Sequence, residues 1–139
     1  MQTPPTQKSE KILFAAVTLG ALVMSLVYYF RDPATTTGFH ACLFHAWTGL
    51  HCAGCGGQRA AHALLRGHIA QAASLNLLAV FTAPAAAYAY VGWALRIFTA
   101  MRLPMPQLSG RRMLWIMATA AAFMFLRNLP WHMFSWLAP

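Results

Sequence analysis

The sequence predicts an all-α integral membrane protein with about three transmembrane helices and a short interfacial amphipathic helix that follows a Cys-x-x-Cys knuckle. Composition is the first support: of 139 residues 59% are hydrophobic and 9% are charged, with a mean hydropathy of +0.51. This is too apolar for a water-soluble domain of this size. Long uncharged stretches, and the concentration of cysteine and histidine in one loop, are the other two supports. We expect residues 1–139 to form a single membrane domain.

The first span is predicted at residues 12–30, which carry no charge and come close to the ~20 residues that a helix needs to cross a bilayer. Residues 1–11 are polar and contain adjacent prolines, so we expect a disordered tail. A cleaved signal peptide is the alternative, since Lys8 and Lys11 would suit its basic start. The apolar run is too long for one, and no Ala-x-Ala site follows it.

Two further spans are predicted, at residues 75–95 and 113–137, separated by a basic loop at 96–112. Pro84 lies within the second span, where a kink is tolerated if neighbouring groups satisfy the backbone. The third span is uncharged only as far as Leu126, so it either ends there or continues with Arg127 at membrane depth. Trp131 and Trp136 suit a membrane interface in both cases.

Charge predicts the orientation of these spans. Three spans place six basic residues on the side of the N-terminus (Lys8, Lys11, Arg96, Arg102, Arg111 and Arg112) and four on the other side (Arg31, Arg59, Arg66 and Arg127). The positive-inside rule then puts the N-terminus in the cytoplasm and the loop at 31–74 on the outer side of the membrane.

The net charge of +8 does not indicate nucleic-acid binding. Its basic residues are scattered singly between apolar runs and do not form the continuous basic patch that a nucleic acid requires. Anionic lipid is the natural partner for charge placed in this way. We therefore expect the lipid bilayer, and possible other membrane subunits, as partners.

The loop at 31–74 contains all three cysteines, in the pattern Cys42-x2-His45-x6-Cys52-x2-Cys55. Glycines at 54 and 56 let the chain turn tightly, as it does around a thiolate-bound metal. Cys42, Cys52, Cys55 and His45 supply enough ligands for a tetrahedral zinc ion, with His51 and His62 as competing fourth ligands.

Two other interpretations of the cysteines stay open. Cys52 and Cys55 have the spacing of a redox pair or disulfide, which an oxidising compartment would favour and which would leave Cys42 unpaired. The cysteines would otherwise be inert small apolar residues in a loop.

A helix is predicted at residues 58–73, directly after the knuckle. It places Arg59, His62 and Arg66 on one face and the apolar positions 60, 61, 64 and 65 on the other, so it could lie flat on the bilayer. Its N-terminus would adjoin Cys55, where the helix dipole and Arg59 would favour the thiolate. The simpler alternative is that its arginines contact lipid phosphates and its histidine is solvated.

Arg127 and Asn128 are candidate supporting residues, because an arginine at membrane depth is costly without a partner. Asp32 on the same side of the membrane, or an anionic metal-thiolate cluster, would provide one. Alternatively, Arg127 extends to the interface at the end of its helix.

These residues resemble a family of small bacterial inner-membrane proteins classed as a domain of unknown function. Its pattern is a cysteine, then Thr-Gly-x-x-Cys-Pro-Gly-Cys-Gly-x-x-Arg, an asparagine at the start of a span, and a C-terminal Arg-Asn-x-Pro. Ala53 and Leu77 replace prolines of that pattern. The resemblance implies a membrane location and marks the cysteines and two arginines as the site, without an activity. The matching positions are Cys42, Thr48, Gly49, Cys52, Gly54, Cys55, Gly56, Arg59, Asn76, Arg127, Asn128 and Pro130.

An accessory or scaffold subunit with a metal- or disulfide-stapled loop is the function that the sequence favours. Asp32 is the one acid available near the cysteines as a general base, and no phosphate loop or Ser-His-Asp set is present, so an enzyme is not favoured. A membrane thiol-disulfide oxidoreductase that uses Cys52 and Cys55 is one alternative. A metal-handling protein, with methionines and histidines that pass a soft ion to the thiolates, is another.

Overall fold

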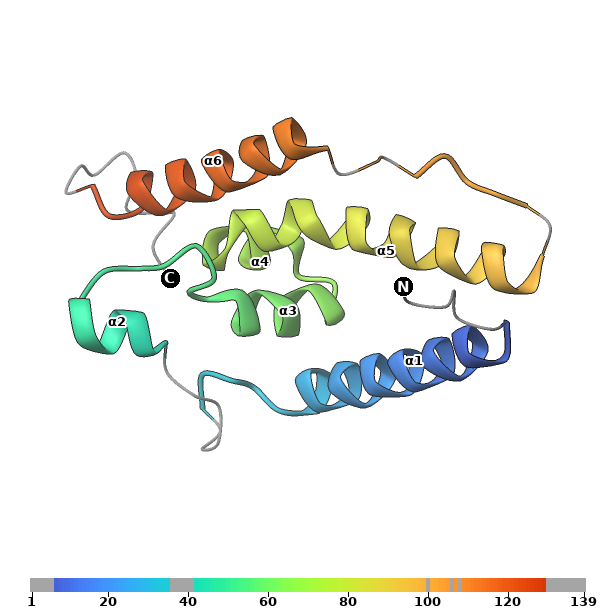
Figure 1. The fold of residues 1–139 in the computed structure, drawn as a ribbon. Coiled ribbons are helices and arrows are strands. Elements are labelled where there is room, and N and C mark those ends of the chain that lie inside the picture. The colour runs from blue at the N-terminus through green and yellow to red at the C-terminus, as the bar shows by residue number, and fades with distance from the viewer. Residues whose placement is uncertain (1–6, 36–41, 100, 106, 108, 130–139) are drawn as a thin grey trace.

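The computed structural model describes residues 7–35, 42–99, 101–105, 107 and 109–129, and this part of the chain contains helices and no strand, as predicted. The six helices are α1 (Gln7–Phe30), α2 (Leu43–Thr48), α3 (Gly57–Leu65), α4 (Ile69–Leu75), α5 (Leu77–Phe98) and α6 (Gly110–Leu126) (Figure 1). Because α1 begins at Gln7, the predicted disordered tail at 1–11 is wrong for residues 7–11. Predictions for Pro130, Trp131, Trp136 and the end of the third span fall outside the described residues.

Helices α1 and α5 are long and apolar enough to cross a membrane, and they coincide with two of the predicted spans. In each, only 6% of the most apolar window is buried inside the protein. The core helix of a water-soluble protein would bury that surface, because burial of apolar area drives its folding. The exposed apolar surfaces of α1 and α5 therefore suit a lipid environment.

One aromatic cluster joins α1 to α5. The ring of Phe14 stacks on Tyr90 at 5.3 Å between centroids and meets the edges of Trp93 and Phe98 at 5.0 and 5.4 Å. The hydroxyls of Thr18 and Tyr90 form a hydrogen bond of 2.8 Å beside it. These contacts pair the two helices in antiparallel orientation (Figure 1).

The predicted single helix at 58–73 is wrong, because the chain turns at Gly67 and forms α3 and α4 instead. Gly67 has a φ of 79°, a left-handed conformation that ends α3 and that a residue with a Cβ adopts only at a cost. Ala60 and Ala63 of α3 pack against Ala72 of α4, and all three are buried. Of the face that was expected to contact lipid, Ala60 is buried in this small core and Leu64 packs against it, whereas Leu65 is exposed.

Polar side chains of α3 bind the C-terminal end of α1. The Nδ1 atom of His62 donates a hydrogen bond to the carbonyl of Tyr28, and Arg66 donates to the carbonyl of Tyr29 at 3.1 and 3.3 Å. The last carbonyls of a helix have no partner within it, so these contacts satisfy two of them. They fix α3, and with it the cysteine knuckle, relative to α1.

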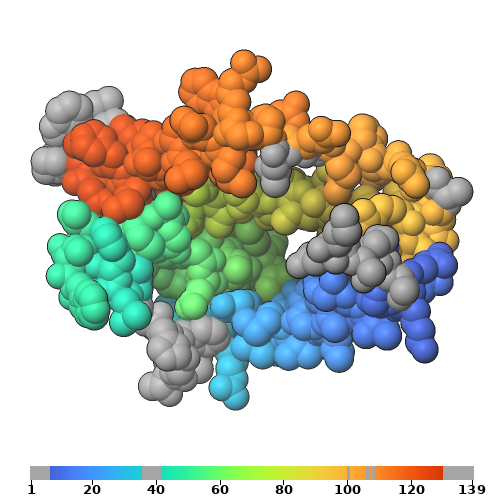
Figure 2. All heavy atoms as spheres, in the orientation of Figure 1, coloured from blue at the N-terminus to red at the C-terminus, as the bar shows by residue number. Residues whose placement is uncertain are grey.

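Helix α6 overlaps the first part of the third predicted span but begins at Gly110, within the predicted basic loop. With 17 residues it is about 25 Å long, shorter than the ~30 Å core of a bilayer. Figure 1 shows α5 between α1 and α6, and in the space-filling view the C-terminal end of α6 lies against the segment that carries the cysteines (Figure 2).

Replacing Gly67 by alanine should lower the free energy of unfolding by about 1 kcal/mol, because alanine is strained at a positive φ. Gly20→Ala is the control, since Gly20 lies within α1 and a Cβ there would meet nothing within 4 Å. That change should be neutral or stabilising. Thermal unfolding followed by circular dichroism in detergent compares the two variants, and equal effects would contradict the proposed role of the turn.

Candidate metal centre

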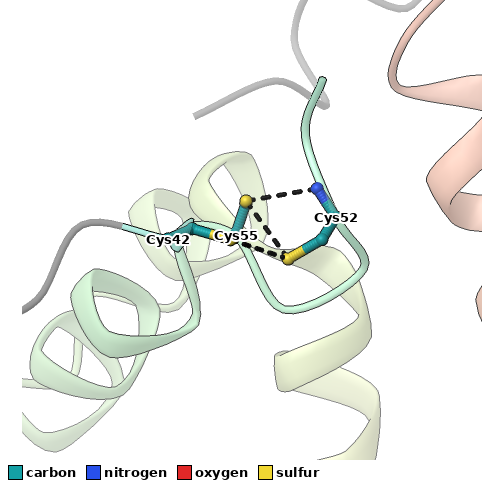
Figure 3. Close-up of side chains that lie close together, drawn as sticks. All are labelled: Cys42, Cys52 and Cys55. Carbon is teal, nitrogen blue, oxygen red and sulfur yellow. Dashed lines mark hydrogen bonds between the residues drawn. The ribbon is translucent and has the colours of Figure 1, made fainter. Parts of the chain in front are cut away.

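A tight turn brings Cys52 and Cys55 together. The amide of Cys55 donates to the carbonyl of Cys52 at 3.1 Å, and Gly56 then takes a φ of 76° at the start of α3. The two sulfurs lie 3.2 Å apart, and the amide of Cys52 donates to the sulfur of Cys55 at 3.2 Å (Figure 3). This is the knuckle that the glycine spacing predicted.

Cys42 adds a third sulfur from the residue before α2. Its Sγ lies 3.4 Å from that of Cys52, and the three sulfurs all lie within 4.8 Å of one another (Figure 3). A tetrahedral zinc ion with bonds of ~2.3 Å to sulfur separates its sulfur ligands by about 3.8 Å. The three thiols are therefore close enough to hold one metal ion.

The described histidines do not join the three sulfurs in this cluster. His45, predicted as the fourth ligand, directs its Nδ1 to the carbonyl of Leu50 at 3.2 Å, and its ring stacks on His51 at 4.4 Å. The Nδ1 of His62, a competing ligand, binds α1 instead. His45 lies in a short helix, α2, that the spacing of the cysteines did not predict.

The thiols differ in acidity. A hydrogen bond from the backbone of His45, helped by the thiol of Cys52, lowers the pKa of Cys42 to about 7. Burial and, to a smaller extent, hydrogen bonds with the neighbouring thiols raise the pKa of Cys55 to about 12. The expectation that the start of the helix and Arg59 would favour the Cys55 thiolate is therefore wrong for the metal-free site, because loss of hydration outweighs both effects.

Arg127 closes the knuckle from α6. Its side chain is 3% exposed, and its Nη1 donates to the carbonyls of Cys52 and Cys55 at 2.9 and 3.1 Å. The Nη2 atom reaches the carbonyl of Leu75 at 3.5 Å, and Nε is buried without a partner among the described residues. The guanidinium is therefore buried in the protein and does not extend to a membrane interface.

Asp32 is not the partner of Arg127. Its carboxylate accepts a hydrogen bond from the amide of Ala34 at 2.8 Å, in a turn after α1. Because the short side chain of Asp32 binds a backbone amide two residues along the chain, its hydrogen bond is made within the turn, and the predicted ion pair with Arg127 does not form.

Asn128 holds the residue before the knuckle. It accepts a hydrogen bond from the amide of His51 at 2.7 Å and donates to the carbonyl of His51 and to that of Met124, each at 2.7 Å. One amide side chain thus pairs both backbone groups of His51 and fixes them to the end of α6.

Asn76 was not predicted as a site residue, although it is 2% exposed and touches the knuckle. Its Nδ2 donates to the carbonyls of Ala53 and Cys55 at 2.9 and 3.0 Å, and its Oδ1 caps α5 by accepting from Ala79 at 2.9 Å. An asparagine before an apolar run is a recognisable helix cap, so the capping of α5 by Asn76 could be predicted from the sequence. The contact with the knuckle is a tertiary contact that no local pattern reveals.

Of the four predicted supporting residues, two contact the knuckle. Arg127 and Asn128 bind the knuckle directly. Arg59 is half-buried in the first turn of α3, and the pKa of His51 is lowered first by burial and then by the charges of His45, Arg127 and Arg59. His62 binds α1.

Residues 42–90 match a family described as a protein of unknown function (DUF2752). The match includes the three cysteines, Asn76 and most of α5, and it supports the resemblance to an uncharacterised family. No curated protein and no solved structure is significantly similar to the chain.

Replacing Asn76 by alanine should lower the free energy of unfolding by roughly 1–3 kcal/mol, because α5 loses its cap and the carbonyl of Ala53 loses its partner. Ser74→Ala is the control, since that exposed hydroxyl donates to the carbonyl of Gln71 within its own helix and water can replace this bond. Unfolding in detergent with a chelator present measures both without a contribution from metal. Equal losses in the two variants would contradict the role assigned to Asn76.

In the metal-free protein, limiting iodoacetamide at pH 7 should modify Cys42 before Cys55. A pKa of about 7 leaves Cys42 roughly half ionised at that pH, and its alkylation should stop accelerating above pH 8. Cys55 is buried and neutral, so it should react only after unfolding. Peptide mapping by mass spectrometry reports both sites, with denatured protein as the control. Earlier modification of Cys55 would contradict the assigned acidities.

Proposed function

We propose that this protein is an integral membrane scaffold in which Cys42, Cys52 and Cys55 hold a zinc ion that fastens the loop to α5 and α6. The observation that carries the proposal is the buried Arg127, which has no carboxylate partner among the described residues and donates hydrogen bonds to the backbone carbonyls of Cys52 and Cys55.

The charges of the site favour a bound metal. The chain has two acidic residues, and both bind other groups. The Glu10 carboxylate lies 3.5 Å from the guanidinium of Arg96, and the Asp32 carboxylate accepts a hydrogen bond within its own turn. A buried charge without a counter-charge costs several kcal/mol. Three thiolates around a divalent ion carry a net charge of −1, which would neutralise the guanidinium of Arg127. The metal-thiolate cluster is thus the counter-ion that the protein otherwise lacks at this position.

The membrane arrangement forms a second part of the proposal. Helices α1, α5 and α6 are three spans of the bacterial inner membrane, with the N-terminus in the cytoplasm and the cysteine loop on the outer side. The exposed apolar surfaces of α1 and α5 and the excess of basic residues near the N-terminus and between α5 and α6 support this orientation. The metal centre then lies at the outer ends of the spans, where it can present a rigid surface to other membrane subunits.

A thiol-disulfide oxidoreductase is the second candidate function, and the acidity of Cys42 is the observation that favours it. Its thiol is half-buried, has a pKa of about 7 and lies 3.4 Å from the sulfur of Cys52. As a thiolate it would attack the disulfide of a partner protein, and Cys52 would then resolve the mixed disulfide. Two electrons would pass to the partner, which leaves as a dithiol.

The scaffold proposal predicts one zinc ion per chain in protein purified from detergent extracts. Arg127→Gln should weaken zinc binding by about 10- to 100-fold, as removal of groups that support metal ligands commonly does. Arg96→Gln, which removes an exposed ion pair with Glu10 far from the cysteines, is the matched control and should leave zinc binding unchanged. Competition with a chromophoric chelator measures the affinities.

Two results would contradict the scaffold proposal. One is equal zinc affinity in the Arg127→Gln and wild-type proteins. The other is protein without metal that contains a reversible disulfide between two of the cysteines, which would favour the oxidoreductase.

A further inference from the structure

We propose that the metal takes only three ligands from this chain and that its fourth position binds an external thiolate. This inference rests on the proposed metal centre and adds the class of ligand that the centre recognises. A complete four-ligand site would act only as a structural staple, whereas an open position makes the centre a binding site.

The donors around the cluster indicate an open position. Three sulfurs are the only potential ligands that converge there among the described residues. Neither ring nitrogen of any described histidine lies within 4.8 Å of all three sulfurs. A zinc ion held by three cysteines therefore still lacks one donor.

The burial of the sulfurs is uneven, so one side of the cluster is accessible. Cys55 is 6% exposed and lies beneath the contacts made by Asn76 and Arg127. Cys42 and Cys52 are only partly buried, and α2 beside Cys42 is exposed along its whole length. An external ligand can approach from the side of Cys42.

The charge near the cluster favours an anionic ligand. Arg127 donates hydrogen bonds to the carbonyls of Cys52 and Cys55, and Arg59 lies in the first turn of α3, directly after the knuckle. Three thiolates and a divalent ion provide one negative charge against these two positive charges. A fourth thiolate would bring the cluster to −2 and balance both arginines. Thiolate is also the anionic donor that a soft, sulfur-rich site prefers.

Binding of the ligand is an exchange without oxidation. A water molecule leaves the metal, the incoming thiol gives its proton to the solvent, and a metal-sulfur bond forms. The thiol can belong to a small molecule or to a cysteine of a protein partner in the membrane, and the chemistry is the same for both.

Cobalt(II) substituted for zinc in the full-length protein provides the test, because its sulfur-to-metal charge-transfer absorption grows with the number of bound thiolates. Wild-type protein should show the absorption of three thiolates, which should rise by about one third when 2-mercaptoethanol or a blocked peptide with one cysteine is added. A rise with 2-mercaptoethanol alone indicates a small-molecule thiol, and a rise with the peptide as well indicates that a protein cysteine can bind. Both results support the proposal.

Matched variants test the contributions of the chain. Arg59→Gln should weaken thiol binding roughly two- to fivefold, whereas Arg66→Gln, whose side chain contacts α1, should not. Replacement of His40, His45, His51 or His132 by alanine should leave the cobalt spectrum unchanged. An altered spectrum in any of these histidine variants, or no rise with either thiol, would overturn the open position while leaving the metal centre intact. Absence of cobalt binding would instead contradict the metal centre itself.

Discussion

A single buried guanidinium, that of Arg127, joins the end of α6 to the cysteine knuckle and to the end of α4. Arg127 at the end of α6 donates hydrogen bonds to Cys52 and Cys55 in the knuckle and to Leu75 at the end of α4. Residues more than fifty positions apart in the sequence are thereby held at one point. Both acidic side chains of the chain are used elsewhere, which is why we propose that a metal bound by the three thiols supplies the counter-charge for this guanidinium.

Amide side chains complete the same arrangement. Asn76 binds the knuckle from the start of α5, and Asn128 binds His51 from the end of α6. Between them, Asn76, Asn128 and Arg127 satisfy the carbonyls of His51, Cys52, Ala53 and Cys55, which a tight turn leaves without helical partners. Because the surrounding side chains satisfy its backbone, the knuckle can bury Cys55, and its two sulfurs lie beside each other and beside the sulfur of Cys42.

The sequence predicted the features that depend on composition and local pattern: the helical class, the approximate positions of α1 and α5, and the turn at Cys52 and Cys55. It also singled out Arg127 and Asn128, which contact the knuckle. The errors arose where tertiary contacts decide. Helical periodicity continues through Gly67, yet the left-handed turn there lets alanines of α3 pack on α4. The spacing of His45 fits a metal ligand, but α2 directs its ring to Leu50 and His51. Asp32 satisfies its own turn, and Asn76 reaches the knuckle across 21 residues.

X-ray absorption at the zinc edge of the purified, full-length protein tests the central claim most directly, because it counts the sulfur atoms bound to the metal without perturbing the site. The account predicts zinc at about one ion per chain, with three sulfur neighbours at ~2.3 Å from Cys42, Cys52 and Cys55 and a fourth neighbour that depends on the added ligand. Protein that retains no zinc, or zinc whose nearest neighbours are all nitrogen or oxygen, would contradict it.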